Sequence, residues 1–226
     1  KYYFIFEVSS HALSQNRIKN FPIDIAALTN ISQDHLDYHK TFKNYRNSKL
    51  KLFKNKLNDN GIAIINNKIK NINYIKNEFR KKNQLITYGN NHSDINIFFT
   101  KLGLNIKIYD KRYRINLKNF SQIELENIEC AISCCLSVGI NAKKIINTLS
   151  TISPPVGRLE EVGKLKNGSK IYIDYAHTPD ALKKVLISKT IDKIKPNLVF
   201  GCGGDRDKSK RIYMGIIANQ YAKNVY

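Results

Sequence analysis

The chain has 226 residues, of which 42% are hydrophobic, so it is long enough for one large domain or about one and a half ordinary ones. No apolar run reaches the ~18 residues of a membrane-spanning helix, and the first residues lack the apolar core and cleavage site of a secretory signal. We therefore expect a cytoplasmic protein that makes no membrane contact. The four cysteines lack the spacings of zinc and redox motifs, which favours reduced, packed thiols.

The charge is strongly basic, since 38 Lys and Arg against 18 Asp and Glu give a net charge of +20. Such an excess raises the hypothesis of a binding module for RNA or another acidic surface. The basic residues are mainly lysines dispersed among Asn and Ile, and no basic block is interleaved with aromatic side chains that stack on bases. We therefore predict no nucleic-acid partner, and a positive field that suits a small phosphorylated substrate.

The first part of the chain alternates strand and helix patterns. Apolar runs predict four strands, at residues 2–8, 24–30, 61–67 and 84–89. Helical patterns lie between them, one from about residue 35 or 41 to 57 and one over 72–80. This βαβα order predicts a parallel α/β sheet.

The pattern changes over residues 94–117, where alternating apolar and polar residues with turn breaks predict antiparallel hairpins. Helices are predicted over 124–138 and 142–150, and Pro154 and Pro155 then stiffen the chain. We place a linker near 151–157, which gives two domains, 1–152 and 153–226. In the second domain we predict strands at 170–173 and 197–200 and helices at 179–187 and after residue 210, again in β-α-β-α order.

The two ends of the chain suggest a piece of a longer protein. It opens on Lys1 and a strand pattern, and it stops at residues 224–226, where another strand pattern begins. No GxxxxGK[ST] phosphate-binding loop occurs in the 226 residues. Because nothing else here would cradle the β- and γ-phosphates of a nucleotide, we expect the chain by itself to be catalytically inactive.

The segment DHLDYH, residues 34–39, is the densest cluster of candidate metal ligands and general bases. On a helix, His35 and His39 would share one face, as in zinc proteases, but Leu36 stands where the catalytic Glu of HExxH would be. One interpretation is that these groups cap a helix and bind one another. Another is a metal-dependent phosphohydrolase built around Glu7, His35, Asp37 and His39.

Other candidates are ambiguous when each is taken alone. Glu7, at the end of a predicted strand, would need a nearby cation, and Mg²⁺ prefers such oxygen ligands. Nothing in its local sequence separates Lys49 from the neighbouring lysines of a solvated helix face. The glycine-rich turn 201–204 offers amides to an anion, and Arg206 and Arg211 beside it either grip a carboxylate or phosphate or are solvated.

The segment Asp174–His177 is equally open. It follows a predicted strand and precedes Pro179, so it is either a nucleotide contact or the N-terminal cap of a helix. Residue chemistry alone favours neither interpretation.

Six segments occur in the order in which one family carries them. They are EVSSHALSQNRI at 7–18, LTNISQDHLDYH at 28–39, YRNSK at 45–49, PVGRLE at 155–160, DYAHTPDAL at 174–182 and FGCGGDRDKSKR at 200–211. Together they resemble the UDP-N-acetylmuramoyl-tripeptide synthetases among the Mur ligases, along almost the whole chain. The resemblance implies an α/β fold, with a P-loop-type central ATPase domain that lacks its P-loop segment, followed by the start of a Rossmann-like C-terminal domain.

The resemblance also implies an activity, the ATP-dependent addition of meso-diaminopimelate or L-lysine to UDP-N-acetylmuramoyl-L-Ala-D-Glu in peptidoglycan synthesis. ATP and Mg²⁺ are the implied cofactors. Lys49 matches the family's carbamylated lysine, and Lys49 and His35 take the catalytic positions. The segment SQIELEN, 121–127, departs from the family's Gly-x-Phe-Asn-x-x-Asn and retains only Asn127.

The remaining site residues are carried over position by position. The implied contacts to the UDP-sugar dipeptide are Ser9, Gln15 and Arg17, and Arg206 matches the group that grips a carboxylate of the incoming diamino acid. The implied metal ligands are Glu7, His35 and carbamylated Lys49. The implied nucleotide-binding residues are Asn127, Arg158, Asp174 and His177.

Overall fold

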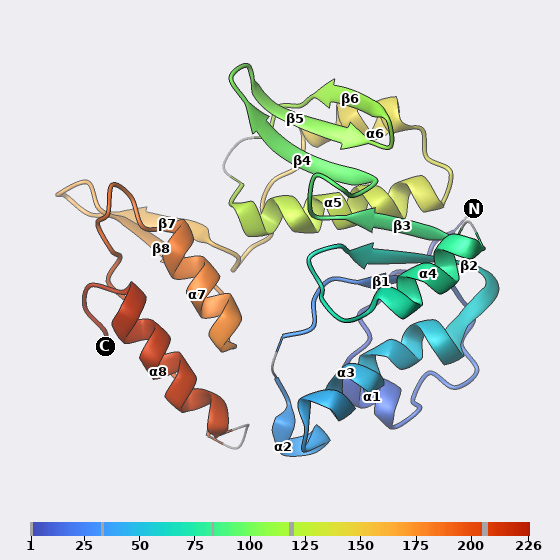
Figure 1. Cartoon of the computed structure of the whole chain (residues 1–226). Coiled ribbons are helices and arrows are strands. Elements are labelled where there is room, and N and C mark those ends of the chain that lie inside the picture. The colour runs from blue at the N-terminus through green and yellow to red at the C-terminus, as the bar shows by residue number, and fades with distance from the viewer. Residues whose placement is uncertain (1, 33, 83, 118–119, 205–207) are drawn as a thin grey trace.

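The computed structural model describes residues 2–32, 34–82, 84–117, 120–204 and 208–226. One six-stranded sheet forms the larger part of the molecule (Figure 1). Its strands follow the chain order, β1 (Ile23–Leu28), β2 (Leu57–Asn66), β3 (Leu85–Tyr88), β4 (Ile95–Thr100), β5 (Gly103–Ile108) and β6 (Lys111–Arg114). The first four strands run parallel, and β4, β5 and β6 form an antiparallel meander. The α/β fold and the hairpins predicted for 94–117 are therefore confirmed.

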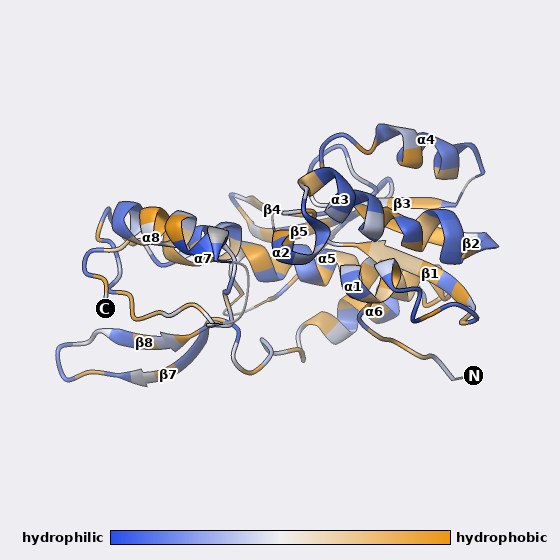
Figure 2. Cartoon of the chain, turned by 90° about the horizontal axis from the view of Figure 1, so that it is seen from below, coloured by the Kyte–Doolittle hydropathy of each residue, from blue (hydrophilic) through white to orange (hydrophobic). Residues whose placement is uncertain are grey.

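Helices cover both faces of this sheet. Short α1 (Ser10–Ser14) and α2 (Leu36–His39) flank β1 in the chain. The longer helices are α3 (Phe42–Lys51), which continues as a π-helical turn over Leu52–Lys56, α4 (Asn73–Lys81), α5 (Gln122–Ser137) and α6 (Ala142–Leu149). Figure 2 shows hydrophobic strands lying between α4 on one side and α6 on the other.

Period-two alternation in β2 divides the interior into two cores. Ile64 points into the core beneath α5 and α6, whereas Ala63 and Ile65 point into the core beneath α3 and α4, and all three are fully buried. A buried Ile side chain contributes about 2–3 kcal/mol of hydrophobic free energy. The apolar run thus specifies a strand covered on both faces, as parallel sheets require.

Side-chain caps set the helix starts. Thr41 begins α3 by accepting a hydrogen bond from the amide of Asn44 at 3.1 Å. Ser121 and Glu124 form a reciprocal capping box at the start of α5. Gly139, with φ of +84°, follows the end of α5, in the left-handed conformation that glycine adopts most readily.

The C-terminal part of the chain is smaller. It contains the antiparallel hairpin β7 (Glu160–Lys164) and β8 (Lys170–Ile173), then α7 (Pro179–Ser188) and α8 (Ser209–Tyr221). A separate core of Leu182, Leu186, Met214 and Ala222 joins the two helices. The predicted helices are confirmed, although the predicted domain boundary at 152/153 stays a prediction.

Three details of the predicted strands are wrong. Residues 2–8 form no strand, because no neighbouring strand among the described residues pairs with them; they are mostly exposed, and the rings of Phe4 and Phe6 lie against each other and Phe21. Residues 197–200 make only an isolated bridge, between Leu198 and Val225. The strand at 170–173 exists, but it pairs with β7 as a hairpin and not in β-α-β order, since the turn at Asn167 and Gly168 brings the chain straight back.

Candidate functional site

The candidate site lies where the loop after β1 meets α1 and α3. Ser9 caps α1, and its hydroxyl accepts a hydrogen bond from the amide of Ala12 at 3.1 Å. The next residue, Ser10, is buried, and its hydroxyl lies 3.0 Å from Nε2 of buried His39 in α2. This bond fixes the start of α1 to the end of α2, although the two residues are 29 positions apart in sequence.

Three histidine rings gather around this bond. The ring centroid of His11 lies 4.7 Å from that of His35, 5.4 Å from that of His39 and 4.3 Å from that of Tyr38. Burial is the main cause that lowers the pKa of both His35 and His39, and the neighbouring His11 lowers them further. Both rings are therefore neutral at pH 7, the form in which an imidazole nitrogen binds a metal.

Lys49 points from α3 to the same loop. Its ammonium donates to the carbonyl of Asn30 at 3.2 Å and lies 5.1 Å from the ring centroid of Tyr45. Burial lowers the pKa of Lys49, while the negative charges of Asp34 and Glu7 act in the opposite direction. A lowered pKa increases the fraction of neutral amine, and only that form adds to CO₂.

Groups from several segments lie close to the carboxylate of Asp34. Its carboxylate accepts the amide of His35 at 2.9 Å and lies 3.4 Å from Nε2 of the same ring. It also lies 3.8 Å from Nε2 of His177 and 3.6 Å from Nζ of Lys210. The last two belong to the C-terminal part of the chain, so the site spans both parts.

A second group of predicted residues meets at the loop after β8. The carboxylate of Asp174 accepts the amides of Leu159 at 2.9 Å and Ala176 at 2.7 Å. The guanidinium of Arg158 lies 4.7 Å from the ring centroid of Tyr175, whose carbonyl is 3.1 Å from Nδ1 of His177. Asp174 thus holds the loop through backbone amides, whereas the N-terminal cap of α7 is Thr178 and not a residue of the 174–177 segment; Arg158 and His177 are exposed.

The structure brings some predicted residues together and leaves others apart. Glu7 lies on an irregular, exposed segment and not at a strand end as predicted, yet it is close enough to Lys49 to act on its pKa. Gln15 and Arg17 are exposed just beyond α1, and Asn127 is exposed on α5. Arg206 lies outside the described residues.

No group of three His, Cys, Asp or Glu side chains in the described ranges is arranged to hold a metal ion. Glu7, His35 and Lys49 therefore fit Mg²⁺ only as a partial shell. That is compatible with Mg²⁺ chemistry, because this ion keeps several waters and binds substrate phosphates through one or two protein ligands. The burial and lowered pKa of Lys49 fit the carbamylation that the family resemblance implies for it.

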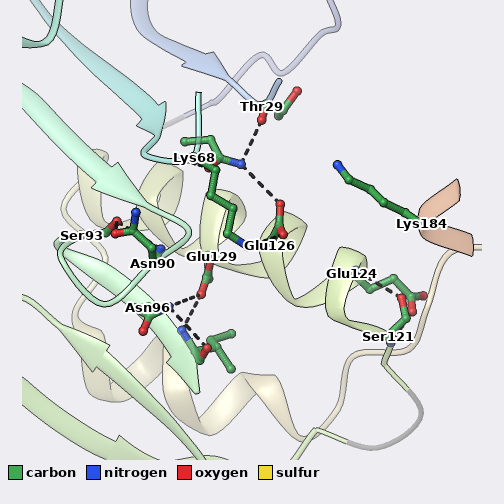
Figure 3. A network of polar contacts seen from close by, with 12 residues as sticks. Thr29, Lys68, Asn90, Ser93, Asn96, Ser121, Glu124, Glu126, Glu129 and Lys184 are labelled. Carbon is green, nitrogen blue, oxygen red and sulfur yellow. Dashed lines mark hydrogen bonds and ion pairs between the residues drawn. The ribbon is translucent and has the colours of Figure 1, made fainter. Parts of the chain in front are cut away.

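A polar network lies at the carboxyl edge of the parallel strands (Figure 3). The amide nitrogen of Asn66 donates to the carbonyl of Thr29 at 3.0 Å and lies 3.4 Å from Oε2 of Glu126. The ammonium of Lys68 lies 2.6 Å from Oε1 of Glu126. This network ties the ends of β1 and β2 to α5, and ligands of open α/β sheets bind at such an edge.

Sequence reasoning missed Ser10 and Lys210 as site residues. Ser10 stands in a run of small polar residues, and Lys210 in a basic run after the glycine turn, so neither local pattern distinguishes them. The signal that separates them is three-dimensional, because both are buried polar side chains that contact another segment.

Two family models match the chain. Residues 1–135 match the Mur ligase middle domain, and residues 157–226 match the glutamate ligase domain of Mur ligases. The chain belongs to the Mur ligase family.

Curated relatives of this Mur ligase chain carry one name. The UDP-N-acetylmuramoyl-L-alanyl-D-glutamate–2,6-diaminopimelate ligase of Rickettsia typhi (strain ATCC VR-144 / Wilmington) is 40% identical over 236 residues, covering 99% of this chain and 46% of that protein. The ligase of the same name from Wigglesworthia glossinidia brevipalpis is 38% identical, covering 98% of this chain and 46% of that protein. The chain thus spans about half the length of the curated relatives it matches.

Solved structures agree on the fold. A structure of a UDP-N-acetylmuramoyl-L-alanyl-D-glutamate–2,6-diaminopimelate ligase superposes with a TM-score of 0.63 at 29% identity, over 96% of this chain and 46% of that one. The MurF ligase from Thermotoga maritima in complex with ADP superposes with a TM-score of 0.71 at 19% identity, over 93% and 49%. The second likeness shows the fold alone. In the described part of the Mur ligase chain, no helix is long and apolar enough to cross a bilayer.

Proposed function

We propose that the protein to which this chain belongs is a cytoplasmic, ATP-dependent ligase that joins meso-diaminopimelate to UDP-N-acetylmuramoyl-L-Ala-D-Glu. The observation that carries the proposal is the setting of Lys49, a half-buried lysine with a lowered pKa next to Asp34 and Glu7. It occurs in a Mur ligase chain that is 40% identical to a ligase of that name over 99% of its length. L-lysine is the competing amino acid.

The exposed residues around α1 suit the binding of the UDP-sugar dipeptide. Ser9 lies at the N-terminal cap of α1, and Gln15 and Arg17 follow its end, all open to solvent. A guanidinium such as Arg17 binds phosphate or carboxylate oxygens bidentately. Arg206 is proposed, by its sequence position alone, to bind a carboxylate of the diamino acid.

The loop after β8 suits the nucleotide. Asp174 holds the loop through two backbone amides and leaves Arg158 and His177 exposed near the middle domain. We assign Asn127, Arg158, Asp174 and His177 to the nucleotide side, with the cationic groups placed to neutralise phosphate charge.

Mg²⁺ would be held by Glu7, His35 and a carbamate on Lys49, and it would supply neutralisation of phosphate charge. Carbamylation would convert Lys49 into an anion able to bind Mg²⁺, and the lowered pKa of His35 leaves its ring neutral, the form in which an imidazole nitrogen binds the same ion. The side chains of this chain thus set the charge around the reacting phosphate.

The reaction we propose has two steps. The terminal carboxylate of the D-Glu residue attacks the γ-phosphorus of ATP, the bond to the β-γ bridging oxygen breaks, and an acyl phosphate and ADP result. The amine of the diamino acid then attacks the acyl carbon, loses a proton, and expels inorganic phosphate to form the amide. Cationic groups stabilise the charge that develops at the tetrahedral stage.

The test is phosphate release by the full-length protein with ATP, Mg²⁺ and UDP-N-acetylmuramoyl-L-Ala-D-Glu, with meso-diaminopimelate or L-lysine added in turn. We expect release only when meso-diaminopimelate is present. Release with L-lysine alone would reassign the amino acid. Release that ignores both would favour the metal-dependent phosphohydrolase, and the absence of release would favour the RNA-binding module; the family matches support neither alternative.

A further inference from the structure

The two parts of the chain have separate interiors. The hydrophobic cores of the middle domain end with residues of α5 and α6, and the core of α7 and α8 shares no residue with them. In the described part of the chain, no helix or strand on one side of the linker packs extensively on one from the other side. Apolar burial therefore does not fix how the two domains are oriented.

Charged groups meet across this boundary instead. Nζ of Lys210, near the start of α8, lies 3.6 Å from Oδ1 of Asp34, and Nε2 of His177 lies 3.8 Å from Oδ2. The side chains of Lys210 and Asp34 are only 8% and 11% exposed. A lysine is rarely so buried unless it is paired, so this contact is more than a chance approach of two surface charges.

Within the middle domain, no Lys or Arg among the described residues pairs with the carboxylate of Asp34, and the ring of His35, the next residue in the chain, lies 3.4 Å away. The ammonium of Lys49 binds the carbonyl of Asn30 and makes no ion pair with Asp34 within 4.0 Å. If Lys49 is carbamylated, as proposed above, its charge becomes negative, and Asp34 depends still more on the cation from the other domain.

We propose that Asp34 is a positioning residue that latches the C-terminal domain onto the middle domain through Lys210 and His177. The latch sets the distance between the Lys49 region and the loop that carries Arg158 and His177. The latch adds a positioning role to the proposed function. Only its effect on ligation rests on that function; its effect on domain orientation does not. Asp34 acts through these two side chains, because its carboxylate is turned toward them and is largely shielded from solvent.

The test measures domain orientation separately from activity. Full-length protein would carry two dyes on unnatural amino acids at Lys101 and Asn167, exposed positions in the β4–β5 and β7–β8 turns, and single-molecule energy transfer would give the ratio of closed to open molecules. Asp34→Asn and Lys210→Met should each lower that ratio about tenfold, the scale of a lost buried charge contact. Asp110→Asn, which removes the same charge from an exposed turn of the middle domain, should leave it unchanged.

A double-mutant cycle decides whether the two charges act together. The double variant, Asp34→Asn with Lys210→Met, should be no more open than the worse single variant, and Asp34→Glu, which keeps the charge, should recover part of the closed population. Wild-type orientation in both single variants, or fully additive effects in the double variant, would overturn the latch. Lys210→Met carries the test if Asp34→Asn does not fold.

Ligation kinetics provide the second measurement. In variants that fold like the wild type, kcat/KM should fall in proportion to the closed fraction, mainly through kcat, because the substrates still bind their own domains. An unchanged kcat in an open variant would overturn the positioning role. If the wild type does not ligate at all, the proposed function fails, and the energy-transfer cycle still decides the latch.

Discussion

The middle domain and the C-terminal part of the chain are stabilised differently. The middle domain buries side chains on both faces of a sheet, and the adjacent residues Ile64 and Ile65 point into opposite cores. The C-terminal part rests on one small core between α7 and α8, and its β7–β8 hairpin is largely exposed. The proposed site residues come from both, so the more extensively packed domain presents Lys49 while the less extensively packed one presents Arg158 and His177.

The largest effect is expected from the part of the candidate site that the middle domain carries. Lys49→Ala should abolish ligation in the full-length protein, more than about 10³-fold, because the carbamate proposed to help hold Mg²⁺ beside the phosphate is lost. Short carboxylic acids added to the assay should restore part of the rate. Lys51→Ala, on the exposed face of the same helix, is the matched control and should keep its activity.

Rescue is what separates carbamylation from a structural role for Lys49. A variant that folds normally, is inactive and recovers with added carboxylic acid supports an anionic carbamate. Wild-type activity in Lys49→Ala would contradict the assignment. The measurement is amino-acid-dependent phosphate release, with circular dichroism to check folding.

The difference between the two cores can be measured by truncating one residue in each. Ile64→Ala removes a fully buried side chain between β2 and α5 and should lower the free energy of unfolding by about 3–4 kcal/mol. Leu186→Ala, in the smaller core, should cost about 2–3 kcal/mol, because fewer neighbours keep the cavity open. Urea unfolding of each variant tests this; a larger cost at Leu186 would reverse the comparison.

Much of this difference could be predicted from sequence. The apolar run at 61–67 predicted β2 because both faces of the strand are apolar, and the helix predicted over 124–138 corresponds to α5, which begins at Gln122 after its Ser121 cap. The strand predicted at 2–8 failed because an apolar run becomes a strand only where a neighbouring strand accepts its backbone. β7 was missed because its residues, EEVGK, are mostly charged or exposed, so the hairpin is defined by its turn rather than by apolar periodicity.

The candidate site, too, could be predicted only in part from the sequence. The cluster at 34–39 was visible as a density of titratable residues, and Lys49 became identifiable only through the family resemblance. The contact of Asp34 with Lys210 joins residues far apart in sequence, and no spacing rule predicts it. Long-range contacts of this kind depend on how the domains are placed, which the local pattern does not encode.

A buried carboxyl in the middle domain should make its stability depend on pH. Glu129 accepts the amide of Ile97 at Oε1, its Oε2 is buried without a partner in the described structure, and burial raises its pKa to about 7. Because the folded state holds this proton more tightly than the unfolded state, the stabilisation is complete below about pH 4.5 and is lost as pH rises through about 7.

Glu129→Gln isolates that contribution. At pH 8 the variant should be more stable than the wild type by about 1–3 kcal/mol, and the difference should shrink toward zero near pH 5. Urea unfolding between pH 5 and 8 gives the curve. Glu78→Gln, on the exposed face of α4, is the control and should follow the wild type; a parallel pH dependence in Glu129→Gln would show that other groups cause it.

The smallest expected effect concerns one helix start. Ser121→Ala removes the acceptor for the amide of Glu124 and should cost about 1 kcal/mol. Ser121→Asp keeps an acceptor at the cap and should retain most of the stability. Equal losses in the two variants would mean that the hydroxyl acts through something other than the cap.

The central claim is the formation of one amide bond, and product mass measures it directly. Full-length protein would be incubated with ATP, Mg²⁺, UDP-N-acetylmuramoyl-L-Ala-D-Glu and equal amounts of meso-diaminopimelate and L-lysine, followed by mass spectrometry. We predict the meso-diaminopimelate tripeptide product, formed one for one with ADP and phosphate and absent without ATP. Phosphate release without any new amide product would contradict the ligase assignment.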